Sequence, residues 1–173
     1  MIIILLGYMG SGKSLVGKTL ASKLSFPFID LDSYIEHIEQ KTISDIFSSK
    51  GEIYFRKVEK KYLTNIIETK NNYVLATGGG TPCYANNMKL LLNNDSIITI
   101  YLKTDLEILV DRLFIEKENR PLISHIGSKS VLSDFIRKHL FERMHFYNQA
   151  TIIVNTKRNK PEEIVEEIVS KLF

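Results

Sequence analysis

The sequence predicts an α/β fold in which a parallel β-sheet is covered by helices on both faces. Short apolar runs rich in β-branched residues alternate along the chain with longer segments of helical period. A glycine-rich stretch, residues 7–14, stands directly between the first apolar run and the first helical segment. With 173 residues, of which 44% are hydrophobic and 25% charged, the composition suits one domain spanning residues 1–173.

The apolar runs predict the five strands of this sheet. We expect them at Ile2–Leu6, Phe28–Asp30, Tyr73–Ala76, Ile97–Leu102 and Thr151–Asn155. No apolar run approaches the ~20 residues that cross a bilayer, so we expect no membrane contact. The single cysteine, Cys83, cannot form an intramolecular disulfide, which favours the reducing cytoplasm.

The segments between these strands carry helix start signals. The signals are the glycine stretch before Lys13–Leu24, an N-cap at Thr42, a capping box from Thr104 to Glu107 opening a helix to about Phe114, and Pro161 in the first turn of the last helix. After Thr42, apolar residues recur at helical spacing, namely Phe55, Val58, Tyr62 and Ile66.

Two stretches fit neither a strand nor a helix comfortably. Residues 31–51 are inserted after the second strand, and we expect a small substrate-binding lobe there, at about residues 31–60. Residues 114–130 contain charges, Pro121, Gly127 and several serines, and we expect a mobile lid over a site.

Residues 7–14, GYMGSGKS, match the phosphate-binding pattern G-x-x-x-x-G-K-[ST] completely. Its backbone N–H groups and the following helix N-terminus suit nucleotide phosphates. We predict an ATP-dependent kinase in which Lys13 reaches the β and γ phosphates and Ser14 ligates Mg²⁺. The other predicted ATP-binding residues here are Gly10, Ser11, Gly12 and Leu15. A glycine-rich turn that merely links strand to helix is the structural alternative.

Two carboxylates, Asp30 and Asp32, follow the second apolar run. In a parallel sheet they would lie beside the glycine loop, and alternation along an extended segment would point both to one side. One could serve the Mg²⁺ shell and the other an acceptor hydroxyl. The alternative is that Asp32 only caps the next helix.

Three arginines and a glycine triplet are further candidates. Arg143 falls on the apolar face of the helical segment 130–147, where it either snorkels to the edge or forks onto an anionic ligand. Arg56 stands one helical turn from Glu59, which could orient it or form only a surface ion pair with it. Arg120, before Pro121, could swing over the γ-phosphate or be solvated. Gly78-Gly79-Gly80 follows the third run, where a ligand could approach bare backbone.

Taken in order, these motifs resemble the shikimate kinase family. They are the phosphate loop, Asp30-x-Asp32, Phe55-Arg56-x-x-Glu59, Thr77-Gly78-Gly79-Gly80, Arg120-Pro121-Leu122 and Glu142-Arg143-x-x-x-Tyr147, and together they cover essentially the whole chain. The resemblance implies a P-loop NTPase fold similar to nucleoside monophosphate kinases, a three-layer sandwich with a five-stranded parallel sheet, a small substrate-binding lobe and a mobile lid.

The resemblance also implies roles for individual residues. Asp32 would orient or deprotonate the attacking hydroxyl, and Asp30 would support Mg²⁺ through water. Arg56 and Arg143 would clamp the shikimate carboxylate, with the glycines of the triplet, Gly79 foremost, at the substrate. Lys13 and Arg120 would stabilise the transferring phosphoryl group, and Arg112 would lie near the adenine. The implied reaction transfers the ATP γ-phosphate to the shikimate 3-hydroxyl, on the route to chorismate.

Other functions remain open at this point. One is another small P-loop kinase, acting on gluconate or a nucleoside monophosphate. A second is a GTP-binding switch, because residues 159–162 are similar to a guanine-reading segment, although that segment ends in Glu162 rather than Asp. As a departure from the shikimate kinase pattern, this chain has Asn159 where that family often has a basic residue near the adenine. A net charge of only +3, dispersed along the chain, predicts a small anionic substrate and no nucleic acid. We also expect a monomer.

Overall fold

The structure is a computed structural model that describes residues 1–69, 71–157 and 160–173. Its centre is a five-stranded sheet in the order β2-β3-β1-β4-β5, with every neighbouring pair parallel. The strands are β1 (Ile2–Leu6), β2 (Phe28–Asp30), β3 (Tyr73–Ala76), β4 (Ile97–Lys103) and β5 (Ile152–Asn155). Each predicted strand is therefore confirmed, and no boundary differs from its prediction by more than one residue.

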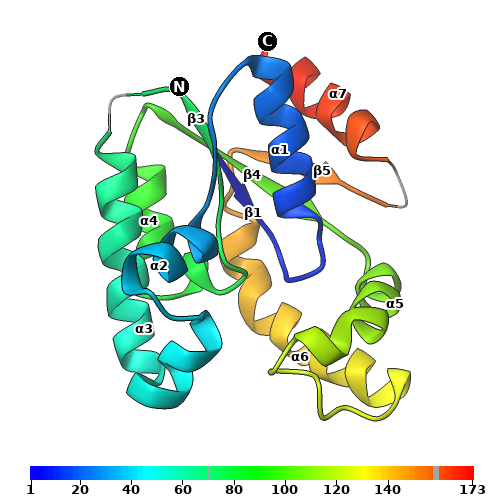
Figure 1. Cartoon of the computed structure of the whole chain (residues 1–173). Helices are drawn as coiled ribbons and strands as arrows, with labels where there is room; N and C mark the ends of the chain where they lie inside the picture. Colours follow the sequence, from blue (N-terminus) through cyan, green and yellow to red (C-terminus); the bar gives the residue numbers. More distant parts are fainter. Residues whose placement is uncertain (70, 158–159) are drawn as a thin grey trace.

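Within the described ranges, seven α-helices connect and cover the strands (Figure 1). They are α1 (Lys13–Leu24), α2 (Leu31–Glu39), α3 (Ile43–Ile67), α4 (Asn87–Leu92), α5 (Leu106–Glu116), α6 (Lys129–Tyr147) and α7 (Pro161–Leu172). The predicted N-cap at Thr42 is confirmed, because its hydroxyl accepts from the Asp45 N–H at 3.0 Å. Pro161 begins α7 as predicted.

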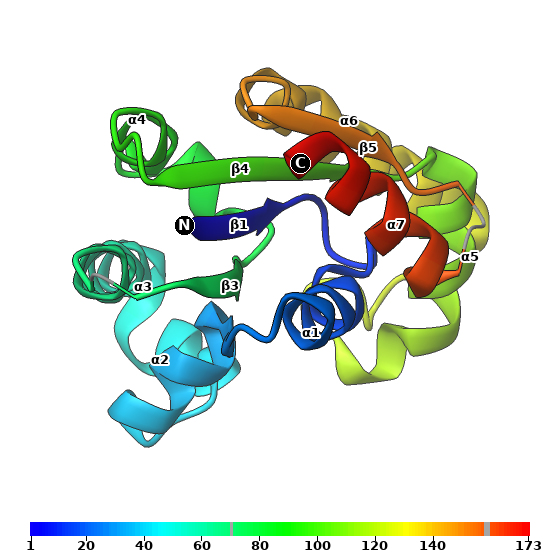
Figure 2. The same ribbon diagram turned by 90° about the horizontal axis from the view of Figure 1, so that it is seen from above.

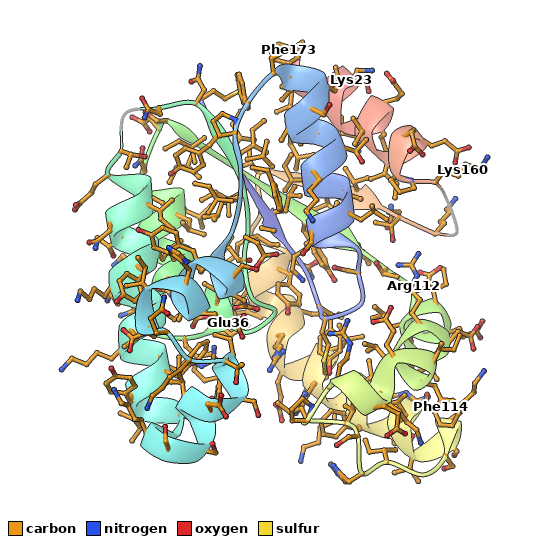
Figure 3. All side chains as sticks on the ribbon, in the orientation of Figure 1. Lys23, Glu36, Arg112, Phe114, Lys160 and Phe173 are labelled. Carbon is orange, nitrogen blue, oxygen red and sulfur yellow. The ribbon has the colours of Figure 1, made fainter. Side chains whose placement is uncertain are left out.

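The sheet has an apolar core on each face, as a parallel sheet requires. Ile3 and Leu5 of β1 pack on one side in a cluster that includes residues of α1 and α7. Ile4 and Leu6 face the other side, where the cluster includes residues of α3 and α4 and the end of α6. Viewed from above, the strands lie between these two helical layers (Figure 2). Figure 3 shows Lys23 at the top of α1, where it forms an ion pair with Glu166 of α7.

A third apolar cluster lies away from the sheet, between α5, α6 and the segment that joins them. It contains Ile123 and Ile126 of that segment, and Tyr8 of the phosphate loop also belongs to it. Lys117 Nζ donates to the Ile126 carbonyl at 3.0 Å and ties the segment to the end of α5. The predicted lid is thus anchored by buried side chains, and its mobility stays a prediction.

Several local expectations are wrong. Residues 31–51 are mostly helical, because α2 follows β2 directly and α3 begins at Ile43. The predicted capping box is absent: α5 has Asp105 as its N-cap, and the Thr104 hydroxyl pairs instead with the Thr156 hydroxyl at 2.8 Å. Helix α5 runs to Glu116, followed by a 3₁₀ turn Lys117–Asn119, which leaves residues 120–128 between it and α6.

No helix within the described ranges has the length and apolarity that crossing a membrane would take.

The kink in α3 gives a stability prediction. Gly51 adopts φ 80° and ψ 172° inside the helix, a region open only to glycine. We expect Gly51→Ala to lower the free energy of unfolding by about 1–3 kcal/mol through backbone strain alone, since nothing lies within 4 Å of the added carbon. Urea unfolding followed by circular dichroism measures this.

Gly127→Ala is the matched control. Gly127 has equally open space around it but does not belong to the glycines of positive φ. If both variants had the same free energy of unfolding, backbone strain at position 51 would not be the cause.

Candidate active site

The phosphate loop joins the carboxyl end of β1 to the N-terminus of α1. Gly10 and Gly12 adopt φ of 79° and 92°, left-handed conformations that let the loop curl before the start of α1. Lys13 Nζ donates to the carbonyls of Gly7 at 2.8 Å and Tyr8 at 3.0 Å. The lysine is thus folded against the loop that would hold the phosphates. Leu15, in the first turn of α1, is largely exposed.

The loop also offers hydroxyl groups. Ser11 Oγ is buried and has no hydrogen-bond partner among the described residues. Ser14 Oγ donates to Asp30 Oδ2 at 2.7 Å. A hydroxyl paired with a carboxylate fits Mg²⁺, which takes few protein oxygens beside nucleotide phosphates and water. Ser14 and Asp30 are therefore the residues that would hold the ion.

Asp30 and Asp32 lie near the phosphate loop, but not for the reason expected from the sequence. Strand β3 lies between β1 and β2, so the carboxylates are not on the strand next to the loop. Alternation along a strand does not apply either, because β2 ends at Asp30 and Asp32 lies in the first turn of α2. The residue that caps α2 is Asp30, whose Oδ1 accepts from the Ser33 N–H at 3.2 Å. Asp32 is left without that capping role.

The carboxyl group of Asp32 has a raised pKa of about 6. Burial is the largest cause, and the nearby carboxylates of Asp30 and Glu59 add to it, while Lys13 opposes it. Lys13 shows the complementary effect, because burial lowers the pKa of its ammonium group to about 8 although Asp32 and Asp30 favour its charged form. The charges of Arg120 and Arg143 also act on Lys13. These groups therefore share one site.

The glycine triplet after β3 lies against three of the predicted residues. A Cβ on Gly78 would stand 3.0 Å from Asp32 Oδ1, and one on Gly80 would stand 2.8 Å from Arg56 Nη2. At Gly79, a Cβ would be 3.2 Å from the backbone nitrogen of Met9 and 3.6 Å from Arg143 Nη1. The triplet thus gathers Asp32, Arg56 and Arg143 beside the phosphate loop.

Arg56 is not the surface ion pair that was its structural alternative. Its side chain is 16% exposed, and Nη1 lies 3.0 Å from Oε2 of Glu59, which is 1% exposed. The other oxygen of Glu59 accepts from the Thr81 hydroxyl at 2.6 Å. The guanidinium carbon also lies 4.0 Å from the centre of the Tyr84 ring, a cation–π contact. Glu59 therefore orients Arg56 as predicted.

Arg143 is half-buried on α6 and lies beside two tyrosines, Tyr8 and Tyr147. Its guanidinium carbon lies 5.5 Å from the centre of the Tyr8 ring. Its charge acts on Tyr147, whose hydroxyl donates to the Gly79 carbonyl. Arg143 therefore faces the triplet and does not snorkel to solvent.

The two remaining arginines lie on the α5 side. Arg120 Nη2 is 2.6 Å from Glu116 Oε2, so it is held at the end of α5. Arg112 projects from α5 (Figure 3), and its Nη1 donates to the Gly10 carbonyl at 3.0 Å. This contact places Arg112 beside the phosphate loop, and its role at the adenine stays a prediction. Asn159, the other residue expected near the adenine, lies outside the described residues.

Sequence reasoning missed Thr81, Tyr84 and Tyr8 as parts of the site. Thr81 and Tyr84 follow the glycine triplet, but no spacing rule marks them. Tyr8 occupies a position that the phosphate-loop pattern leaves unspecified. The fold brings Tyr84 and Tyr8 to the arginines and Thr81 to Glu59, which orients Arg56.

Comparison with known proteins decides the family. The family model for shikimate kinase matches residues 9–173. The chain belongs to the shikimate kinase family. Shikimate kinases are ATP-dependent kinases that act with Mg²⁺, and the loop and oxygen ligands described above fit both.

Shikimate kinases similar to this chain align along nearly its whole length. The Flavobacterium psychrophilum enzyme is 46% identical over 173 residues, covering 99% of this chain and 98% of that protein. The crystal structure of the Bacteroides thetaiotaomicron enzyme has a TM-score of 0.90 at 38% identity, covering 99% and 98% of the two chains. The Acinetobacter baumannii enzyme, solved in complex with shikimate, has a TM-score of 0.88 at 32% identity, covering 99% of this chain and 92% of that one.

The raised pKa of Asp32 predicts a stability effect with a definite sign. Between its ordinary value of 3.8 and about 6, the folded protein holds a proton on this carboxyl that the unfolded chain has lost. The folding free energy therefore becomes less favourable as pH rises through this window. We expect Asp32→Asn to raise the free energy of unfolding at pH 7.5 by roughly 1–3 kcal/mol, and the gain to disappear below pH ~4.

Urea unfolding at a series of pH values measures this effect, and Asp134→Asn is the control because Asp134 is exposed on α6. A gain that is the same at every pH, or a loss at pH 7.5, would contradict the burial of an ionised Asp32.

Proposed function

We propose that this site transfers the γ-phosphate of ATP to the 3-hydroxyl of shikimate, giving shikimate 3-phosphate and ADP. The observation that carries the proposal is the glycine triplet, which borders Asp32, Arg56 and Arg143 on one side and the phosphate loop at Met9 on the other. An acceptor carrying both a carboxylate and hydroxyl groups matches this set.

On the nucleotide side, the backbone amides of Gly10, Ser11 and Gly12 bind the phosphates of ATP together with Ser14 and Leu15. Lys13 leaves the two loop carbonyls that it now contacts and binds the β and γ phosphates. Ser14 and Asp30 would hold Mg²⁺, which would supply neutralisation of the phosphate charge when bound. Arg112, which donates to the Gly10 carbonyl, lies near the adenine of the bound ATP in this proposal.

On the acceptor side, Arg56 and Arg143 bind the shikimate carboxylate, for which planar guanidinium groups are suited. Asp32 accepts a hydrogen bond from the attacking hydroxyl and takes its proton as the new oxygen–phosphorus bond forms. The bond to the β-phosphate oxygen breaks, and ADP leaves with that electron pair. Lys13 and Arg120 stabilise the charge on the transferring group.

The two peripheral parts have separate tasks in this proposal. The lobe at about residues 31–60 carries Asp32 and Arg56, so it forms the acceptor site. The lid at about residues 114–130 carries Arg120 and excludes water, which would otherwise replace shikimate as acceptor. The proposal keeps the monomer expected from the sequence, and the single cysteine, Cys83, favours the cytoplasm.

Release of ADP from ATP and Mg²⁺, with shikimate added or withheld, tests the function. We expect release to require shikimate and not to be supported by gluconate or AMP.

Arg143→Ala and Arg56→Lys should each raise the KM for shikimate at least about tenfold and leave the KM for ATP within about twofold. Each variant loses one bidentate pair of hydrogen bonds between a guanidinium group and the shikimate carboxylate. Lys13→Ala should abolish release.

Arg137→Ala is the control for Arg143, because Arg137 is also on α6 but its side chain is 66% exposed. Efficient turnover of gluconate or AMP would assign the site to another acceptor. An equal rise in both KM values for Arg143→Ala would remove Arg143 from the carboxylate clamp.

A further inference from the structure

We propose that Tyr8 is a positioning residue that fixes the guanidinium of Arg143 for the acceptor carboxylate and so joins the phosphate loop to the acceptor site. The inference rests on the proposed function and concerns how Arg143 is held. Tyr8 is the second residue of the loop, and its side chain is 1% exposed. It packs among residues of α5, α6 and the lid.

Tyr8 is fixed at both ends. Its backbone carbonyl accepts from Lys13 Nζ at 3.0 Å, and its hydroxyl lies 3.2 Å from His139 Nδ1 on α6. Burial raises the pKa of the phenol to about 12, so the hydroxyl is neutral at physiological pH. A neutral hydroxyl can share a hydrogen bond with a neutral imidazole, and burial lowers the pKa of His139. The ring therefore has one fixed orientation.

The face of that ring is turned toward Arg143. The guanidinium carbon lies 5.5 Å from the ring centre, within the range of a cation–π interaction. Among the described residues no carboxylate forms an ion pair with Arg143, whereas Arg56 is held by Glu52 and Glu59. The two arginines are thus oriented by different means. Two tyrosines orient Arg143: Tyr8 offers the face of its ring, and Tyr147 shares a side-chain hydrogen bond with the guanidinium. The remaining donors of Arg143 are not taken by a carboxylate of the described residues.

Position 8 therefore requires an aromatic ring and not merely apolar volume. An aliphatic residue would fill the cluster between α5 and α6 but would remove the ring face over which the guanidinium of Arg143 lies, leaving the hydrogen bond with Tyr147 to hold it. Arg143 would then sample other rotamers, and the acceptor would lose part of its carboxylate clamp. The loss would fall on shikimate, because Tyr8 contacts Lys13 only through its backbone carbonyl.

Steady-state kinetics of two variants test this. We expect Tyr8→Leu to raise the KM for shikimate about tenfold, the order of a half-buried cation–π contact, with the KM for ATP within about twofold. Tyr8→Phe keeps the ring and loses only the hydroxyl, so its KM for shikimate should stay within about twofold of the unmodified enzyme. Should Tyr8→Leu fail to fold, Tyr8→Met fills more of the space without a ring and should give the same result.

Val110→Ala is the matched control, because Val110 belongs to the same cluster but lies on α5. It should lower the melting temperature and leave the KM for shikimate unchanged. An unchanged KM for shikimate in a folded Tyr8→Leu or Tyr8→Met, or an equal rise for both substrates, would overturn the role of Tyr8. Absence of shikimate-dependent ADP release by the unmodified enzyme would instead overturn the proposed function.

Discussion

The active site depends on a close approach of side chains to the bare backbone of Gly78, Gly79 and Gly80. A Cβ at the first or the third of these positions would lie within 3.0 Å of a side-chain atom of Asp32 or Arg56. The middle glycine approaches both the phosphate loop and Arg143. Because β3 lies between β1 and β2, the triplet is the wall that the nucleotide side and the acceptor side share. The fold thus brings the phosphate loop, Asp32, Arg56 and Arg143 to one stretch of main chain.

The same arrangement gathers buried charges of both signs at a cost in stability. Burial raises the pKa of Asp32 and lowers the pKa of Lys13, so each would be easier to ionise in water. Glu59, which is also buried, is compensated by Arg56 and the Thr81 hydroxyl. Charges in such surroundings act strongly on a phosphoryl group in transfer, because little water screens them. The protein keeps this site at the expense of stability that neutral residues would restore.

The sequence predicted the strands and the phosphate loop accurately because both are marked locally, by apolar runs and by a complete motif. It did not predict the sheet order, which is set by long-range packing and places β3 beside β1. It also misjudged residues 31–51, where α2 is short and α3 is kinked at Gly51. The cap of α5 was misassigned because Thr104 has a distant partner, Thr156, that no local pattern reveals. Tyr8 was overlooked for the same reason, since its partners lie on α6.

The central claim is that one backbone wall serves two ligands, and a two-ligand NMR titration of amide resonances tests it most directly. Addition of shikimate alone should shift the amide signals of Gly79 and Gly80, and addition of ADP with Mg²⁺ should shift those of Gly10 and Gly12. With both ligands present, the signal of Gly79 should differ from its position with shikimate alone, because that residue approaches the loop at Met9. Unchanged signals of Gly79 and Gly80 at saturating shikimate would contradict the account.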